Sequence, residues 1–170
     1  MEEIIDLLKE SHRLAGESGG DSGELQKSQD ACRKALQKIR QRLENERDDI
    51  RLWQMMLGCM DQGGVWTSDD GEYDETWLEV VEHMIRLNPQ DDDAAYDGSY
   101  WNDGYSEGGG LYYLHFHALA DVYYFGDKEE GWPDSDHGVK AAEALRKAVE
   151  LHPEKRDFLQ EEAEAVDIVL

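Results

Sequence analysis

The chain has 170 residues, enough for one domain with a core of its own, and 39% of them are hydrophobic. Its formal net charge of −23 disfavours direct binding to nucleic acid or to an anionic membrane, because contacts with phosphate require Lys and Arg. The N-terminal stretch lacks the apolar run of a signal peptide, and no segment approaches the roughly 20 apolar residues of a membrane span, so we expect a cytoplasmic protein.

Apolar residues recur at helical spacing, and no stretch alternates like a half-buried strand, so we predict an all-α fold of about seven helices. The first helix covers 2–15, and two alternative buried faces fit its pattern: Ile4, Leu8 and His12, or Ile5, Leu8 and Ala15. The second runs from about 24 to 45, and its apolar stripe is Leu25, Cys32, Leu36, Ile39 and Leu43. The third, 51–60, follows a cap at Asp48 or Asp49, and its apolar density predicts a buried helix.

Prolines and capping residues delimit the remaining helices. The fourth ends at Asn88-Pro89, because proline disfavours helical geometry in the residue before it, and its stripe is Trp77, Val80, Val81, Met84 and Leu87. The fifth covers about 111–125, with the stripe Leu111, Leu114, Phe116, Leu119, Val122 and Tyr123. The sixth is capped by Ser135 or Asp136 and is expected to pack through Val139, Ala142, Leu145, Ala148 and Val149. Pro153 starts the seventh, whose predicted inward residues are Phe158, Leu159, Ala163, Val166 and Val169.

Acidic and aromatic residues coincide in the middle of the chain. Between residues 61 and 137 there are 20 Asp/Glu but only two basic residues, and 14 of the 16 aromatics lie between Trp66 and Trp132. Three irregular segments, 61–73, 90–110 and 126–137, carry many of them. Their candidate partner-binding residues are Trp66, Asp69, Asp70, Glu72, Tyr73, Asp91, Asp92, Asp93, Tyr96, Asp97, Tyr100, Trp101, Asp103, Tyr105, Glu129, Glu130, Trp132 and Asp134.

These residue types suit a surface for basic proteins, because Tyr and Trp are enriched at binding hot spots and attract Arg and Lys through cation–π contacts. We expect Tyr96, Tyr100 and Trp101 to be partly exposed and to face the same side as Trp66 and Trp132. The alternative is that these rings fold back as lids over the helices.

No pattern in the chain predicts catalysis or a cofactor. The carboxylates from Asp91 to Asp103 lack the spacing of a calcium loop, and the glycines at 108–110 are not followed by the Lys and Ser/Thr of a phosphate-binding loop. His115 and His117 are two residues apart on a helix, so they cannot share a metal. Cys32 and Cys59 fall in helical apolar patterns, which predicts two buried free thiols and a reducing compartment. We therefore expect no metal, no cofactor and no enzymatic activity.

Helices four and six end alike, because EVVEHMIRLNP (79–89) and EALRKAVELHP (143–153) place apolar residues in corresponding positions before a proline. The region 48–160 resembles tetratricopeptide or Sel1-like repeats. The residues that carry the resemblance are Phe116, Leu119, Ala120, Tyr123, Ala141, Leu145, Ala148 and Pro153 in the second repeat, and Leu57, Gly58 and Pro89 in the first.

The resemblance implies helices stacked as antiparallel pairs in an α-α superhelix, here with long acidic loops in place of the family's short turns. It divides a single domain, 1–170, into N-terminal helices at 1–46, two repeats within 48–160 and a capping helix at 154–170.

The leading functional hypothesis is an acidic module that captures a basic protein, such as an inhibitor or immunity-type protein that neutralises a cationic toxin or a nucleic-acid-acting enzyme. One alternative is a scaffold or adaptor that binds a peptide along its helical faces. Another is a metal-dependent enzyme that uses the loop carboxylates, and a further account of the acidity is adaptation to high salt. The sequence leaves the oligomeric state open.

Overall fold

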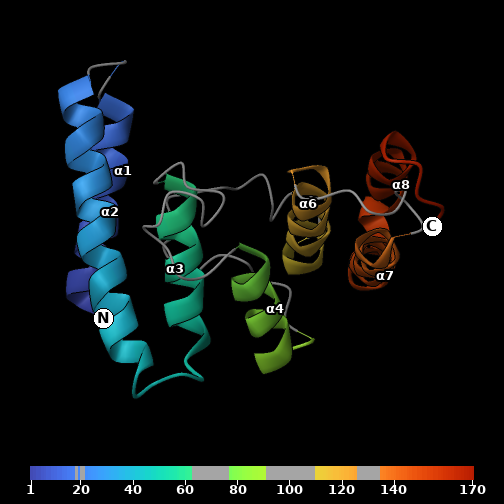
Figure 1. Cartoon of the computed structure of the whole chain (residues 1–170), viewed down its shortest axis with the longest axis horizontal. Coiled ribbons are helices and arrows are strands. Elements are labelled where there is room, and N and C mark those ends of the chain that lie inside the picture. Colours follow the sequence, from blue (N-terminus) through green and yellow to red (C-terminus); the bar gives the residue numbers. More distant parts are fainter. Residues whose placement is uncertain (18, 20–21, 63–76, 91–109, 126–134) are drawn as a thin grey trace. The chain divides into compact units, whose positions relative to one another are not determined.

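The computed structural model describes residues 1–17, 19, 22–62, 77–90, 110–125 and 135–170, and these residues form helices, turns and no strand (Figure 1). Seven α-helices and one 3-10 helix are found in this part of the chain, which confirms the prediction of an all-helical fold. In chain order they are α1 (Glu2–Glu17), α2 (Ser22–Leu43), α3 (Ile50–Gln62), α4 (Trp77–Leu87), α6 (Gly110–Phe125), α7 (Asp136–Leu151), η2 (Pro153–Lys155) and α8 (Arg156–Ala165).

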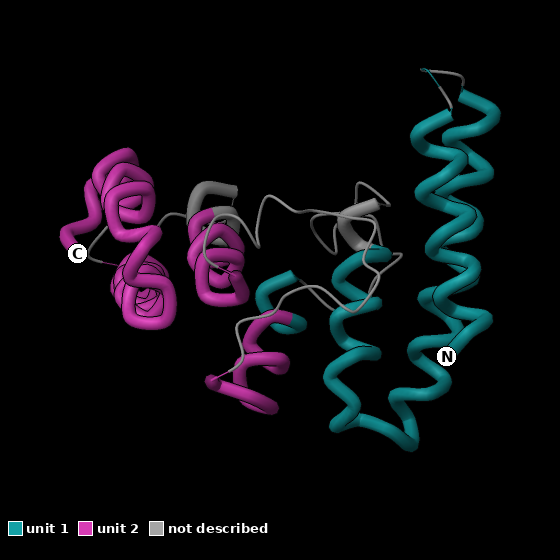
Figure 2. Tube along the Cα trace, turned by 180° about the vertical axis from the view of Figure 1, so that it is seen from behind, with its two compact units in different colours: residues 1–80, 95–102 teal, residues 81–94, 103–170 magenta. Residues whose placement is uncertain are grey.

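The helices group into two compact units, coloured separately in Figure 2. Among the described residues, unit 1 comprises those up to Val80 and unit 2 those from Val81 onward, so the boundary falls within α4.

In unit 1, α1 and α2 form an antiparallel hairpin. Contacts pair residue 3 with residue 38 and residue 11 with residue 28, so the numbering of the two helices runs in opposite directions. Five acidic and two basic residues lie in α1, while α2 has two acidic and six basic residues. The excess charges of the two helices are therefore opposite in sign, and Glu3 of α1 forms a 2.8 Å ion pair with Lys38 of α2.

The buried face of α1 consists of Ile4, Leu8, Ser11 and Leu14. It fits the first predicted alternative except for His12, which is exposed, and the second less well, because Ile5 is half-buried and Ala15 is exposed. In α2 the buried residues begin at Ser28 and continue to Leu43. Leu25 is 45% exposed, so its prediction as a core residue was wrong. In the antiparallel register Leu25 lies near the connected end of the hairpin, where α1 ends and presents the exposed Ala15.

The third helix of unit 1, α3, packs against α2 and is capped as predicted. The Asp49 carboxylate accepts a 3.0 Å hydrogen bond from the backbone N–H of Arg51, which satisfies a donor that the first turn of a helix leaves unpaired. Trp53 donates from its indole nitrogen to the Arg47 carbonyl oxygen at 2.7 Å. The segment from Leu52 to Cys59 is buried throughout, in agreement with its apolar density.

The fourth helix, α4, ends at Leu87, immediately before Asn88-Pro89, as the sequence predicts. Four of its five predicted stripe residues are buried, namely Trp77, Val80, Val81 and Met84.

In unit 2, α6 packs against α7, and α7 contacts η2 and α8. Gly110 begins α6 with a φ of 70°, a conformation that L side chains rarely adopt, and this accounts for a glycine at that position. The hydroxyl of Ser135 accepts a 3.0 Å hydrogen bond from the Gly138 N–H, so Ser135 is the cap of α7.

A Schellman turn ends α8. Asp167 has a φ of 60°, the Ile168 N–H donates to the Ala163 carbonyl at 2.9 Å, and the Asp167 N–H donates to the Glu164 carbonyl at 3.2 Å. The turn directs Ile168, which is 3% exposed, into the core. Val169 is 80% exposed, so the sequence prediction that it points inward was wrong.

Two further predicted core residues are exposed, Val139 at 51% and Phe158 at 40%. Val139 lies at helical spacing from exposed residues of α7, Glu143, Arg146 and Glu150, whereas Gly138, Ala141 and Leu145 form the buried face. Phe158 similarly precedes the buried stripe of α8, which consists of Leu159 and Ala163.

Substitutions on the buried and the exposed face of α7 should differ in their effect on the free energy of unfolding. Leu145→Ala removes a fully buried side chain and should lower the free energy of unfolding by about 2–5 kcal/mol. Val139→Ala, at a half-exposed position, should change it by less than about 0.5 kcal/mol. Urea denaturation followed by circular dichroism measures both, and equal losses would contradict the assignment of the faces.

The C-terminal turn gives a second stability prediction. Asp167→Gly should raise the free energy of unfolding by about 0.5–1 kcal/mol, because glycine adopts a positive φ without the clash that Cβ causes. Glu164→Gly, three residues earlier within α8, is the control and should lower the stability. A destabilising Asp167→Gly would show that the Asp167 side chain matters more than its backbone conformation.

Candidate functional site

All eighteen candidate partner-binding residues lie outside the described residues, so the expected exposure and common orientation of their rings stay predictions. Their charge is nonetheless defined by the sequence. The segments 63–76, 91–109 and 126–134 together contain 15 Asp/Glu and one basic residue, Lys128, which is −14 of the net −23. They also contain seven of the 16 aromatic residues. These segments follow α3, α4 and α6, respectively.

Within unit 2, a cluster of polar and aromatic side chains joins α6 to α8. The Tyr113 hydroxyl donates to Glu162 Oε2 at 3.0 Å, and His117 Nε2 lies 3.7 Å from the same oxygen. The Tyr113 ring meets the rings of His117 and Phe158 edge-on, with centroid distances of 4.5 and 5.5 Å. Tyr113 is 8% exposed. The cluster therefore holds the Glu162 carboxylate and the His117 imidazole at the border between core and solvent.

A second histidine contact joins α6 to α4. His115 Nε2 lies 3.6 Å from Glu82 Oε1, which is too long for a good hydrogen bond. Burial lowers the pKa of His115, and the positive charge of Lys140 acts in the same direction, while Glu82 opposes both by favouring the protonated form. Burial is the largest of these effects, so the neutral imidazole is favoured.

Tyr112 makes a second contact between α6 and the end of α4. The Tyr112 hydroxyl donates to the Pro89 carbonyl at 2.9 Å, just beyond the end of α4, and burial raises the pKa of Tyr112. Side chains at 112 and 115 thus hold α6 against the α4 segment of unit 2, and those at 113 and 117 hold it against α8.

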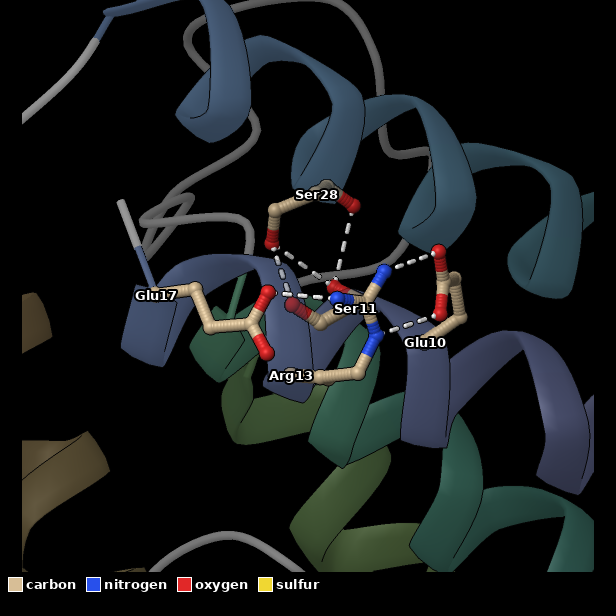
Figure 3. Close-up of polar contacts among 5 residues, drawn as sticks. All are labelled: Glu10, Ser11, Arg13, Glu17 and Ser28. Atoms are coloured by element: carbon tan, nitrogen blue, oxygen red, sulfur yellow. Dashed lines mark hydrogen bonds and ion pairs between the residues drawn. The ribbon is translucent and has the colours of Figure 1, made fainter.

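The interior of unit 1 contains a small polar network between α1, α2 and α3. The Ser11 hydroxyl donates to the Ser28 carbonyl at 2.9 Å, and the Ser28 hydroxyl donates to the Ser11 carbonyl at 2.8 Å, so the two serines bond reciprocally across the hairpin (Figure 3). Ser11 Oγ also lies 3.0 Å from Cys32 Sγ, and Cys32 in turn neighbours Cys59 of α3. Both serines and both cysteines are at most 1% exposed.

Ser11 Oγ also lies 3.0 Å from Ser28 Oγ, and in this contact, as in the contact with Cys32 Sγ, either atom can be the donor. The neighbouring Cys32 and burial raise the pKa of the Cys59 thiol well above its usual range.

Charged residues on the outer side of α1 are paired among themselves. Arg13 binds both Glu10 and Glu17 (Figure 3), and the hydrogen bond from Arg13 lowers the pKa of Glu10. All three side chains are about half exposed, so these ion pairs contribute little to stability.

A groove of about 250 Å³ opens between α7 and the C-terminal turn. Its lining includes the exposed Val139 and Val169 together with Arg146, which donates to the Val169 carbonyl at 3.1 Å. The groove is apolar apart from Arg146 and Asp167, and its size suits one or two aliphatic side chains of another molecule.

In the part of the chain that the structure describes, no three His, Cys, Asp or Glu side chains gather closely enough to hold a metal ion. The described helices also include none with the length and apolar character needed to cross a membrane. Comparisons of the chain with protein-family models, with curated proteins and with solved structures find no match.

Sequence reasoning missed the cluster around Glu162. It assigned a role to neither Glu162 nor Tyr113. Tyr113 and Glu162 are 49 residues apart, and no short motif connects them. The prediction that Cys32 and Cys59 are buried free thiols is confirmed, whereas their contact with each other and with Ser11 comes from the packing of three helices.

The buried histidine predicts a pH dependence. The folded protein holds the pKa of His115 below the 6.5 of an exposed histidine, so below that pH the unfolded chain takes up the proton more readily. The free energy of unfolding should therefore fall as the pH drops from 7 to 5, by at most about 1.4 kcal/mol per pH unit from this group. His115→Gln should reduce that fall in pH-dependent urea denaturation. His12→Gln, at an exposed position of α1, is the control, and identical pH profiles for wild type and His115→Gln would contradict the assignment.

Proposed function

We propose that the chain is an acidic protein-binding module that captures a basic protein. In its most concrete form it is an inhibitor or immunity-type protein that neutralises a cationic toxin or enzyme. The observation that carries the proposal is the concentration of charge, since three segments between helices contain −14 of the net −23 together with seven aromatic residues.

The described helices support the proposal because, unlike the three segments, they carry mixed charges. They carry charges of both signs, as in the acidic α1 beside the basic α2, and their ion pairs lie within or between neighbouring helices. A general adaptation to high salt would spread acidic residues over the helices as well. The excess is instead placed in the segments that connect them, where a partner's Arg and Lys side chains would meet both carboxylates and aromatic rings.

Such a surface would act mainly on the rate of association. Long-range attraction between an acidic and a basic protein raises association rate constants to about 10⁸–10⁹ M⁻¹s⁻¹ at low salt, and the gain is lost as salt screens the charges. Tyr and Trp would then slow dissociation, because they bury large areas at a low entropic cost.

For the scaffold, we propose that α3 with α4 and α6 with α7 are two divergent helix-pair repeats of the tetratricopeptide or Sel1-like kind. The packing of α6 against α7 supports the second pair. In repeat proteins, insertions map to loops on one face, which is often the binding face.

The adaptor hypothesis has one supporting observation, the apolar groove that includes Val139 and Val169. A peptide bound along the helical faces would place aliphatic side chains there, and the acidic segments would not be needed for its affinity.

Charge neutralisation tests the proposal. The full chain, immobilised as wild type and as a variant with Asn in place of Asp91, Asp92, Asp93, Asp97 and Asp103, is used to capture proteins from native extract at low and at physiological salt. We expect wild type to retain a basic protein and the variant to lose it. With that protein purified, the association rate constant at low salt should fall at least about tenfold in the variant.

The matched control neutralises five exposed acids of unit 2 that lie on helices, namely Glu143, Glu150, Glu154, Asp157 and Glu161. This variant should retain the partner and most of the association rate. If both variants bind as wild type while Val139→Glu abolishes binding, the adaptor function is the correct one. An association rate that does not depend on salt would rule out electrostatic steering.

A further inference from the structure

Two helix faces of unit 2 meet around the carboxylate of Glu162. Phe158 and Glu162 are one turn apart on α8, and Tyr113 and His117 are one turn apart on α6, so each pair lies on one face of its helix. Tyr113 contacts both Phe158 and Glu162. We propose that these four residues bind an arginine side chain of the basic partner. The inference rests on the proposed function, to which it adds a site and the residue type that the site takes.

The Glu162 carboxylate has no basic side chain beside it. Its contacts are the Tyr113 hydroxyl, 3.0 Å from Oε2, and His117 Nε2, 3.7 Å from the same oxygen. In the part of the chain that the structure describes, no Lys or Arg forms an ion pair with Glu162, and Oε1 has no hydrogen-bond partner. The side chain is 32% exposed, so a cation from another molecule can reach it.

Phe158 supplies an aromatic ring next to this carboxylate. It is 40% exposed, although it is a large apolar residue. Its ring lies 5.5 Å from that of Tyr113, centroid to centroid, at an interplanar angle of 61°, so the rings are not stacked and at least one face of Phe158 is left for another group. Because side chains one turn apart start roughly 5–6 Å from each other, a guanidinium on that face can donate its N–H groups to Glu162.

A ring face beside a carboxylate favours arginine over lysine. A guanidinium is planar, stacks on aromatic rings and donates from a fixed fork, whereas an ammonium is a compact and more strongly hydrated charge. The Tyr113 hydroxyl holds Oε2 of Glu162 in place, which reduces the entropy that the carboxylate loses on binding. The surroundings attract a cation, since α8 contains four Asp/Glu and one basic residue.

The hydrogen bond between Tyr113 and Glu162 also joins α6 to α8, and this structural role can be separated from binding. It needs an acceptor at residue 162 but no negative charge. In Glu162→Gln the amide oxygen can still accept from Tyr113, whereas the attraction for a guanidinium is lost. This substitution therefore tests the charge and keeps the tether.

The test titrates the full chain, with its three phenylalanines isotopically labelled, with Nα-acetyl-arginine amide and follows the ring signals by NMR. The Phe158 signal is identified by its absence in Phe158→Leu, and the signal of the buried Phe116 is the internal control. We expect a saturable shift at Phe158. The lysine derivative should bind several-fold more weakly, and the citrulline derivative, in which a neutral urea replaces the guanidinium, should give no saturable shift.

Glu162→Gln should weaken binding of the arginine derivative at least about tenfold, and Glu161→Gln, at the adjacent exposed position, should change it by less than about twofold. Equal losses in the two variants would overturn the site, because they would show attraction to the net charge alone. Shifts of equal size with arginine and citrulline derivatives, or none with arginine, would also overturn it. The comparison of these derivatives on wild type decides the question even if a variant folds poorly.

The capture experiment of the proposed function distinguishes the two proposals. If wild type retains a basic protein but Phe158 does not respond to the arginine derivative, the inference about Glu162 is wrong and the proposed function stands. If Phe158 responds and no basic protein is captured, the proposed function is wrong and the arginine site stands.

Discussion

Like charges repel throughout a chain with a net charge of −23, so packed faces form only where charged side chains stay away from them. Among the residues whose burial the structure describes (1–17, 19, 22–59, 77–90, 110–120 and 135–170), no Asp, Glu, Lys or Arg is buried, and the buried polar side chains are three serines and one glutamine. The α1–α2 hairpin shows how the helices meet this constraint, because an acidic helix lies along a basic one. Most of the excess charge lies in three segments between helices, where it does not oppose helix packing and, in the proposed function, attracts a partner.

Burial of polar groups in unit 1 follows the complementary rule that each one needs a partner. Ser11 and Ser28 satisfy each other's hydroxyls through backbone carbonyls, and Ser11 Oγ also contacts Cys32 Sγ. A shift of α1 against α2 by one residue would break both serine bonds at once. The network thus helps to fix the register of the hairpin.

In unit 2, α6 is the helix whose polar side chains connect its neighbours. Its residues at 112 and 115 meet the end and the middle of the α4 segment, and those at 113 and 117 meet Glu162 of α8. Residues two apart on a helix point in nearly opposite directions, so His115 and His117 reach different neighbours. The spacing that excludes a shared metal site is the spacing that lets α6 contact two helices through its histidines.

Local patterns in the sequence were sufficient for the elements and for several of their ends, because helical periodicity, capping residues and prolines act within a few residues. The last helix is the exception, because Pro153 begins a 3-10 helix and α8 ends at Ala165 instead of continuing to the end of the chain. Asp49, Ser135 and Asn88-Pro89 all mark the helix boundaries that they predict. The buried faces of the helices were predicted less reliably, because a helix with apolar residues on two sides offers more than one apolar stripe. Four residues predicted to be buried are exposed: Leu25, Val139, Phe158 and Val169. Only the neighbouring helix decides which stripe is covered.

For the candidate sites, too, some features follow from the sequence and others only from the tertiary structure. The sequence by itself determined an all-helical protein with most of its charge between its helices, because composition and periodicity are properties of the chain alone. Only the tertiary structure decided that Cys32 meets Cys59 and Ser11, and that Glu162 meets Tyr113 and His117. These contacts join residues 21 to 49 positions apart, and the packing of separate helices, which no local pattern encodes, brings them together.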